Sequence, residues 1–217
     1  MAHLLVTFAV REEGIPFQKL IGERPELRVR LTGIGPRNAE RSIRQALIEQ
    51  TPACVFTCGF AGGLNPALTA GHVLFAADEE SGRSATLLAA GAHPAVFHCV
   101  DRICTTAREK RALRERTAAD AVEMESGIIR RICREHGIPG ATVRVISDAA
   151  DEDLPLDFNA LMDAEQNLHH GRLAAALLRS PASIGALLRL RKQTRAAARK
   201  LAEVLVRVIS DPAPAAR

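Results

Sequence analysis

The sequence has no tryptophan and no tyrosine, and aromatic residues make up only 3% of its 217 residues. Its core must therefore consist mainly of aliphatic side chains, which fits a hydrophobic content of 47%. Proteins that bind single-stranded nucleic acids commonly stack the bases on aromatic rings. With so few rings we expect no nucleic-acid partner, even though the net charge is +4.

Paired cysteines and clustered metal ligands are also missing. The cysteines are odd in number and form no C-x-x-C pair, so neither a disulfide framework nor a zinc site is expected. They are Cys54, Cys58, Cys99, Cys104 and Cys133. The histidines show no spacing typical of metal ligands. We therefore expect a protein of the reducing cytoplasm that uses no metal and no cofactor. No apolar run is long enough to cross a bilayer.

The basic residues are concentrated near the C-terminus. From Arg172 to Arg207, nine arginines and lysines accompany a single acid, Glu203. Leucines and other apolar residues recur between them at helical spacing, which predicts a basic amphipathic helix. Such a helix could pack its apolar face on the domain or on a partner subunit, or could lie peripherally on an anionic membrane. We expect one domain over residues 1–217, with a basic helical segment from about 172 to 209.

Apolar strands and helices alternate along the rest of the chain, which predicts an α/β protein. The expected strands are His3–Val10, Pro25–Thr32, a run from Ala53 that stops at the glycine cluster after Cys58, His72–Ala77 and Ala141–Ile146. The expected helices follow the first strand, run from about Asn38 to Gln50, cover Thr105–Arg116, extend from the A-V-E-M-E-S motif to Gly137 and lie within Phe158–Ile209. This order favours a mixed, mostly parallel central sheet flanked by helices.

Polar residues and glycines are predicted to meet at one edge of this sheet. Glu13, Gly59, Gly62, Gly63 and Asp148 all follow the ends of predicted strands. In open α/β sheets, ligands bind at the carboxyl ends of the strands. We therefore expect a binding site there, and the glycines would allow a ligand to approach the backbone closely.

Two motifs place carboxylates among apolar residues. A-V-E-M-E-S contains Glu123 and Glu125, and V-R-V-I-S-D ends on Asp148. Burying a carboxylate without partners costs free energy, so acids in such surroundings either lie at the ends of helices and strands or form a functional site. Glu123 is compatible with both interpretations, because the first turn of a helix stabilises acids through the helix dipole.

Together these two motifs resemble the paired motifs of the purine nucleoside phosphorylase and nucleosidase superfamily, especially of the methylthioadenosine/adenosylhomocysteine nucleosidases. F-A-V-R-E-E-G, T-G-I-G-P-R-N-A and C-G-F-A-G-G-L resemble the superfamily's acidic turn, small-residue loop and glycine cluster, in the same order. The resemblance reaches to about residue 168. It implies a three-layer nucleoside-phosphorylase-like fold and cleavage of the N-glycosidic bond of a purine nucleoside, with adenine as the expected base.

The resemblance also implies a role for each acid. Breaking the bond places positive charge on the ribose and negative charge on the base, so the site needs an acid for the base and anchors for the sugar. Asp148 is the implied general acid toward N7, Glu125 the anchor of the ribose hydroxyls, and Glu13 the residue that positions and deprotonates water. The other implied substrate-binding residues are Met124 on the ribose face, Glu123, Ser147, Arg144, Gly59, Phe60, Ala61, Gly62 and Ile103.

The nucleophile distinguishes a hydrolase from a phosphorylase. The sequence has Thr57 and Phe60 where phosphorylases are expected to carry an arginine and a serine for phosphate. A phenylalanine side chain cannot hydrogen-bond an anion, so these positions favour water. Arg11 and Arg37 are the alternative phosphate ligands, and they keep a phosphate-dependent reaction open.

The chain departs from the nucleosidase pattern in two places. It is much shorter between Val73 and Val122, and Ile103 stands where the superfamily places a base-stacking phenylalanine. The superfamily implies a homodimer or larger assembly built around this region. The V-x-M-E-S motif and the arginine-rich end also resemble bacterial phosphorylase-like proteins associated with hopanoid synthesis, which act on an adenosine-linked lipid.

Hydrolysis of a purine nucleoside is thus the reaction that the sequence favours. The alternatives are a phosphate-dependent phosphorylase, including one acting on an adenosine-linked hopanoid lipid, and a non-catalytic nucleoside-binding protein.

Overall fold

The structure is a computed structural model that describes residues 3–163, 166, 169–180 and 183–210. Its strands are β1 (Leu4–Phe8), β2 (Leu27–Leu31), β3 (Cys54–Gly63), β4 (Val73–Ala77), β5 (His93–Pro94), β6 (Phe97–Cys99), β7 (Ala121–Glu123) and β8 (Gly140–Asp148). Its helices are α1 (Arg11–Ile21), α2 (Pro36–Glu49), α3 (Ser84–Ala89), α4 (Ala107–Thr117), α5 (Ser126–Glu135), α6 (Phe158–Leu161), α7 (His170–Arg179) and α8 (Ser183–Ser210), with a short 3₁₀ turn at Glu79–Ser81.

The central sheet is mixed and mostly parallel, as the sequence predicts. Its main order is β2-β1-β3-β8-β4-β5, in which β2, β1, β3 and β8 are mutually parallel and β4 runs antiparallel to β8. At the far end of β3, the short strand β7 pairs antiparallel with it and parallel with β6. All nine residues of β8 are buried, which is typical of a strand covered on both faces.

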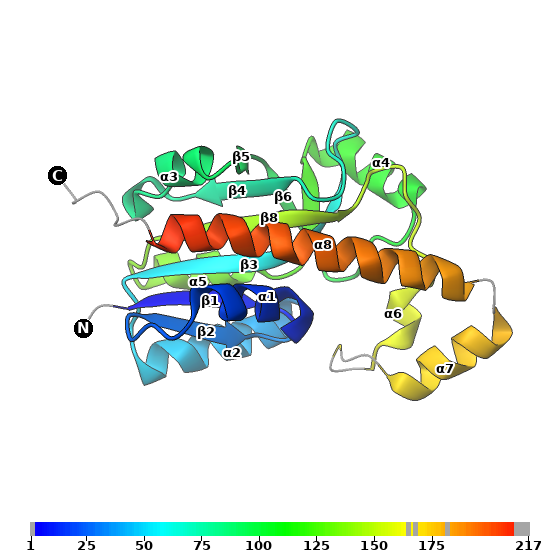
Figure 1. The fold of residues 1–217 in the computed structure, drawn as a ribbon, viewed down its shortest axis with the longest axis horizontal. Helices are drawn as coiled ribbons and strands as arrows, with labels where there is room; N and C mark the ends of the chain where they lie inside the picture. Colours follow the sequence, from blue (N-terminus) through cyan, green and yellow to red (C-terminus); the bar gives the residue numbers. More distant parts are fainter. Residues whose placement is uncertain (1–2, 164–165, 167–168, 181–182, 211–217) are drawn as a thin grey trace.

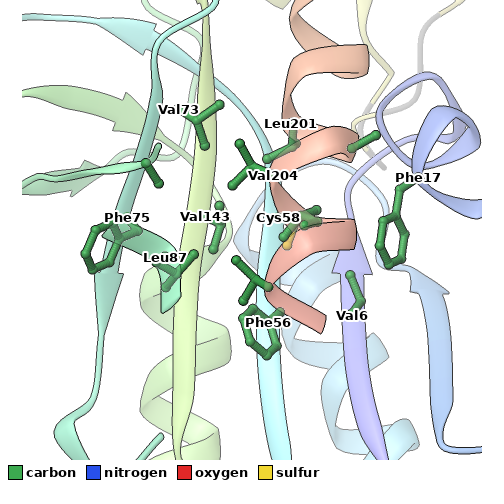
Figure 2. Packing of buried hydrophobic residues seen from close by; sticks show 14 of the residues in the cluster. Val6, Phe17, Phe56, Cys58, Val73, Phe75, Leu87, Val143, Leu201 and Val204 are labelled. Atoms are coloured by element: carbon green, nitrogen blue, oxygen red, sulfur yellow. The ribbon is translucent and has the colours of Figure 1, made fainter. Parts of the chain in front are cut away.

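Helices cover both faces of the sheet and give a three-layer α/β fold (Figure 1). One core cluster joins α1, α3 and α8 to the sheet, and a second joins α2 and α5 to its other face. Successive strand residues alternate between the clusters: Leu5 and Val55 belong to the second, whereas Val6 and Phe56 belong to the first. In Figure 2, side chains of α1 and α8 lie against those of the strands.

The predicted third strand ends within the glycine cluster, at Gly63, after an irregularity between Ala61 and Gly62 at which its register against β8 shifts and it pairs with β7. One predicted boundary is wrong. The A-V-E-M-E-S motif does not open as a helix. Its first three residues form β7, and α5 begins only at Ser126. Glu123 is therefore the last residue of a strand and not part of a helix's first turn.

The basic C-terminal segment contributes to the core. The apolar face of α8, which includes Leu201, Val204, Leu205 and Val208, is buried against the sheet and α1. The interpretation that this helix packs on its own domain is therefore confirmed for its second half, while peripheral membrane contact and subunit contact stay predictions. Across the described ranges, no helix has both the length and the hydropathy that a membrane span requires.

Candidate active site

A cavity of about 250 Å³ lies at the carboxyl ends of β1, β3 and β8, where the sequence predicts a site. Most of the predicted residues line it: Glu13, Phe60, Ala61, Gly62, Ile103, Glu123, Met124, Glu125, Ser147 and Asp148. Gly59 and Arg144 do not line the cavity but lie directly behind it. The sequence thus predicts the location of the cavity and most of its polar lining.

Glu13 lies in the first turn of α1 and is buried, whereas its neighbour Glu12 is exposed. Its carboxylate accepts hydrogen bonds from the backbone N–H groups of Ala9 at 2.9 Å, Val10 at 3.1 Å and Phe60 at 2.8 Å. Burial raises the pKa of Glu13, although nearby Arg144 and the three amides oppose this effect. The side chain is therefore fixed at the cavity wall, with room on its two oxygens for a further donor.

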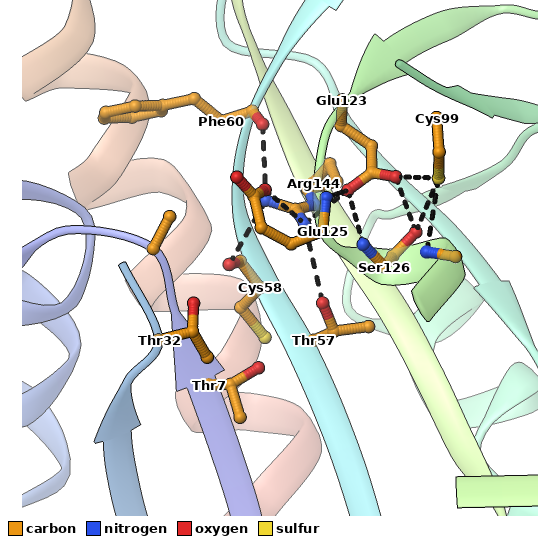
Figure 3. A network of polar contacts seen from close by, with 12 residues as sticks. Thr7, Thr32, Thr57, Cys58, Phe60, Cys99, Glu123, Glu125, Ser126 and Arg144 are labelled. Atoms are coloured by element: carbon orange, nitrogen blue, oxygen red, sulfur yellow. Dashed lines mark hydrogen bonds and ion pairs between the residues drawn. The ribbon is translucent and has the colours of Figure 1, made fainter. Parts of the chain in front are cut away.

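Arg144 connects the two acids of the A-V-E-M-E-S motif (Figure 3). Its side chain is 1% exposed, and Nη2 lies 2.5 Å from Glu123 Oε2 and 3.2 Å from Glu125 Oε2. Its guanidinium also approaches the carbonyl oxygens of Cys58 and Phe60. One buried cation thus neutralises part of the charge of a cluster that also includes Glu13, which explains how several acids can be buried together.

Glu125 and Glu123 differ in their electrostatic environment. Glu125 accepts a hydrogen bond from the Gly35 backbone at 2.9 Å. Burial, supplemented by repulsion from Glu123, raises the pKa of Glu125 to about 7 against the attraction of Arg144. Burial alone would also raise the pKa of Glu123, but Arg144 and hydrogen bonds from Cys99 and Ser126 outweigh it and lower that pKa. Glu123 is therefore the permanent counter-ion of Arg144, and Glu125 is the acid that titrates near neutrality.

The backbone N–H groups of Glu125 and Ser126 donate to Glu123 Oε2 at 3.0 and 2.8 Å. Glu123 therefore caps the N-terminus of α5 from the preceding strand. It combines the two interpretations that the sequence left open, because it both stabilises a helix end and lines the cavity.

Asp148 ends β8 beside Gly62 and is held by two side chains. The Ser147 hydroxyl donates to Oδ1 at 2.5 Å, so Ser147 holds this carboxylate in addition to lining the cavity. The Lys110 ammonium lies 2.5 Å from Oδ2. Lys110 is not among the predicted site residues, because it stands among the charged residues of α4, where a lysine is expected to be exposed to solvent. Its spacing of three residues from the apolar Leu113, which places both on one helix face, is the only hint of its burial.

The glycines make room for these side chains. Gly59 adopts φ +148°, and a Cβ there would lie 2.6 Å from both Arg144 Nη1 and Glu13 Oε1. A Cβ on Gly62 would lie 3.4 Å from Asp148 Oδ2. The packing of the charged cluster therefore requires a glycine at position 59, and its expected role in substrate binding stays a prediction.

The remainder of the cavity wall is largely apolar. Ile103 lies in it as expected, together with residues that were not predicted from the sequence: Val10, Ile34, Val100, Cys104, Leu154, Phe158, Leu190 and Thr194. Phe158, on α6, supplies an aromatic ring that Ile103 cannot. Leu190 and Thr194 belong to α8, so the C-terminal helix also forms part of the wall. Neither a composition nor a motif could identify these residues, because only the fold brings α6 and α8 to the cavity.

The alternative phosphate ligands and the possibility of a metal site can both be examined in the structure. Arg11 and Arg37 do not line the cavity; the one cationic side chain among its described lining residues is Arg102, which is exposed and paired with Glu109 at 2.6 Å. In the described part of the chain, no group of three or more His, Cys, Asp or Glu side chains is arranged to hold a metal ion.

Comparison with known proteins agrees with the motifs. The family model described as "Phosphorylase superfamily" matches residues 84–179. A 5'-methylthioadenosine/S-adenosylhomocysteine nucleosidase of Shewanella oneidensis is 38% identical over 58 residues, which cover 27% of this chain and 25% of that protein. The corresponding protein of Shewanella halifaxensis is 32% identical over 77 residues, covering 36% and 33%. The matched segments therefore span only a quarter to a third of these relatives.

Solved structures resemble the chain over nearly its whole length. Futalosine hydrolase of Helicobacter pylori, in a mutant form, superposes with a TM-score of 0.71 at 17% identity, covering 97% of this chain and 99% of that one. The 5'-methylthioadenosine/S-adenosyl homocysteine nucleosidase of Campylobacter jejuni gives a TM-score of 0.70 at 16% identity, covering 96% and 99%. These two enzymes therefore share the fold of this chain. The resemblance to the phosphorylase and nucleosidase superfamily is confirmed by the family model over residues 84–179 and by the partial sequence matches.

Proposed function

We propose that this protein hydrolyses the N-glycosidic bond of a purine nucleoside, with adenine as the preferred base. The observation that carries the proposal is the arrangement of Glu13, Glu125 and Asp148 around one cavity, with Arg144 behind it. These acids match the three tasks of the reaction, which are activating water, holding the ribose and protonating the base. The similar nucleosidases support the same reaction class.

Each acid suits its task by its environment. Asp148 lines the cavity at the end of β8, where it would reach N7 of the purine as general acid. Glu125, once ionised, would accept hydrogen bonds from the two ribose hydroxyls. Glu13 is fixed by three backbone amides and would orient a water molecule toward the anomeric carbon. Met124 and Phe158 would contact the sugar and the apolar parts of the substrate.

The cavity favours water over phosphate as the nucleophile. A phosphate site requires cationic or hydroxyl donors near the anomeric carbon. Arg144 is already engaged by two carboxylates, Phe60 offers only its ring, and Arg11 and Arg37 lie away from the described lining. Glu123, and Glu125 when it is ionised, would also repel a phosphate dianion.

Product analysis tests the proposal. Purified protein is incubated with adenosine, inosine, methylthioadenosine and adenosylhomocysteine, with and without phosphate, and the base and the sugar are identified. We expect free base and free sugar without phosphate. Sugar 1-phosphate that forms only with phosphate would replace hydrolysis by phosphorolysis, and binding of a nucleoside without any product would show a non-catalytic relative.

A further inference from the structure

Lys110 carries a buried charge that the proposed reaction has not used. Its side chain is 0% exposed, and an ammonium is buried only where its charge and its donors are satisfied. Nζ lies 2.5 Å from Asp148 Oδ2, 2.7 Å from the Ala149 carbonyl oxygen and 2.8 Å from the Glu152 carbonyl oxygen. Three acceptors match the three N–H groups of an ammonium, whereas a neutral amine has only two. The number of acceptors therefore matches the number of donors on the ammonium form.

The ammonium protons of Lys110 lie beside the carboxylate that is the proposed general acid. Asp148 needs a proton at the moment the base departs, and Oδ1 already accepts the Ser147 hydroxyl. The ammonium on Oδ2 is the nearest charged donor. Lys110 does not line the cavity, while Asp148 does. Lys110 can therefore influence the base only through Asp148.

Building on the proposed function, we propose that Lys110 is a positioning residue that also stores the proton which Asp148 passes to the departing purine. As the glycosidic bond breaks, its electron pair moves to the base. A Lys110 N–H bond breaks, its proton moves to Asp148, and Asp148 delivers one proton to N7. Lys110 is left as a neutral amine, Asp148 is again a carboxylate, and the base leaves neutral. The proton that Glu13 takes from water balances the one that Lys110 gives. After product release, solvent in the cavity takes the proton from Glu13 and returns one to Lys110 through Asp148.

A purely structural role is the competing explanation, because Lys110 also fixes the loop that follows β8. The chain offers a matched control for that role. Gln193 on α8 donates to the Ser147 carbonyl oxygen at 2.9 Å and to Glu152 Oε2 at 3.0 Å, so it holds the same loop from the other side. It carries no ionisable proton. Loosening the loop through Gln193 should therefore affect all substrates alike.

The test compares leaving groups. Adenosine needs a proton on its base, whereas 4-nitrophenyl riboside releases a nitrophenolate that needs none. We expect Lys110→Met to lower kcat on adenosine by about 100-fold or more, within the range of general acid catalysis, and to change kcat on the nitrophenyl riboside by less than about threefold. Gln193→Leu should lower both rates by similar factors, and Arg111→Met, at an exposed position of α4, should change neither. Equal loss on both substrates in Lys110→Met, or no loss, would overturn the proposal.

Two further variants keep the test decisive. Lys110→Gln retains donors for the two carbonyl oxygens and replaces Lys110→Met if that variant does not fold. Lys110→Ala removes the side chain, and added methylammonium should restore adenosine cleavage in proportion to its concentration. This rescue also tests the proton store if wild type does not cleave the nitrophenyl riboside. Absence of rescue in a folded Lys110→Ala protein would then count against the proton store. A wild-type protein that releases no base refutes the proposed function itself, whereas full activity of the Lys110 variants refutes only the role of Lys110.

Discussion

Replacing Glu125 by glutamine should make the protein more stable at alkaline pH. Burial raises the pKa of Glu125 from 4.5 to about 7. An acid whose pKa is higher in the folded state loses its proton first in the unfolded chain, so the free energy of unfolding falls as pH rises from 4.5 to 7. At about 1.4 kcal/mol per pKa unit, wild type should lose about 2.5 kcal/mol between pH 5 and pH 8 through this one group. Glu125→Gln removes that loss.

Urea unfolding of both proteins at pH 5 and pH 8 measures the effect. Relative to wild type, Glu125→Gln should gain about 2.5 kcal/mol of unfolding free energy between the two pH values. Glu13, whose pKa burial also raises, is present in both proteins, so most of its own contribution cancels. Glu123→Gln is the comparison variant: since the pKa of Glu123 is lowered, the loss of its stabilising effect should lower the unfolding free energy at both pH values. Because repulsion from Glu123 also helps to raise the pKa of Glu125, this variant should be less destabilised at pH 8 than at pH 5, but it should not gain stability over wild type as Glu125→Gln does. A Glu125→Gln difference that does not change with pH would refute our description of the buried cluster.

Other substitutions test the remaining parts of the site. Gly59→Ala should lower the unfolding free energy by roughly 2 kcal/mol or more, because its Cβ would meet Arg144 and Glu13, whereas Gly71→Ala, at φ +95° with no atom nearby, should cost less in the same unfolding assay. Glu13→Gln should lower kcat for nucleoside hydrolysis by about 100-fold or more with little change in KM, and an unchanged kcat would exclude it as the base. Phe158→Ala should raise KM by roughly tenfold through lost ring contact, and an unchanged KM would place its ring outside the substrate site.

The sequence predicts much of the fold because its strands are strongly apolar. The runs around β1, β3 and β8 are continuous, so their order and the edge at which they end are readable. The exceptions are β5, β6 and β7, whose two or three residues are too few to show a period. The acids of the A-V-E-M-E-S motif favour the start of a helix, so the sequence predicts a helix there. In the structure, pairing with β3 and β6 makes the first three residues of the motif a strand.

The residues of the candidate site also differ in how far the sequence predicts them. Glu125 and Asp148 belong to motifs and are predictable, while Lys110 and Phe158 are brought to the cavity by tertiary packing alone. A lysine on a highly charged helix is ordinarily exposed. Only the turn of α4 toward the end of β8 buries Lys110, and no local pattern encodes that turn.

The most direct test of the central claim compares wild type with Asp148→Asn. Adenine release from adenosine is followed by chromatography, and nucleoside binding is followed by calorimetry. We expect Asp148→Asn to release adenine at least about 1,000-fold more slowly while its affinity for adenosine changes little, since the variant keeps the ribose anchor but cannot donate the proton. Release of adenine at the wild-type rate by Asp148→Asn would contradict the account.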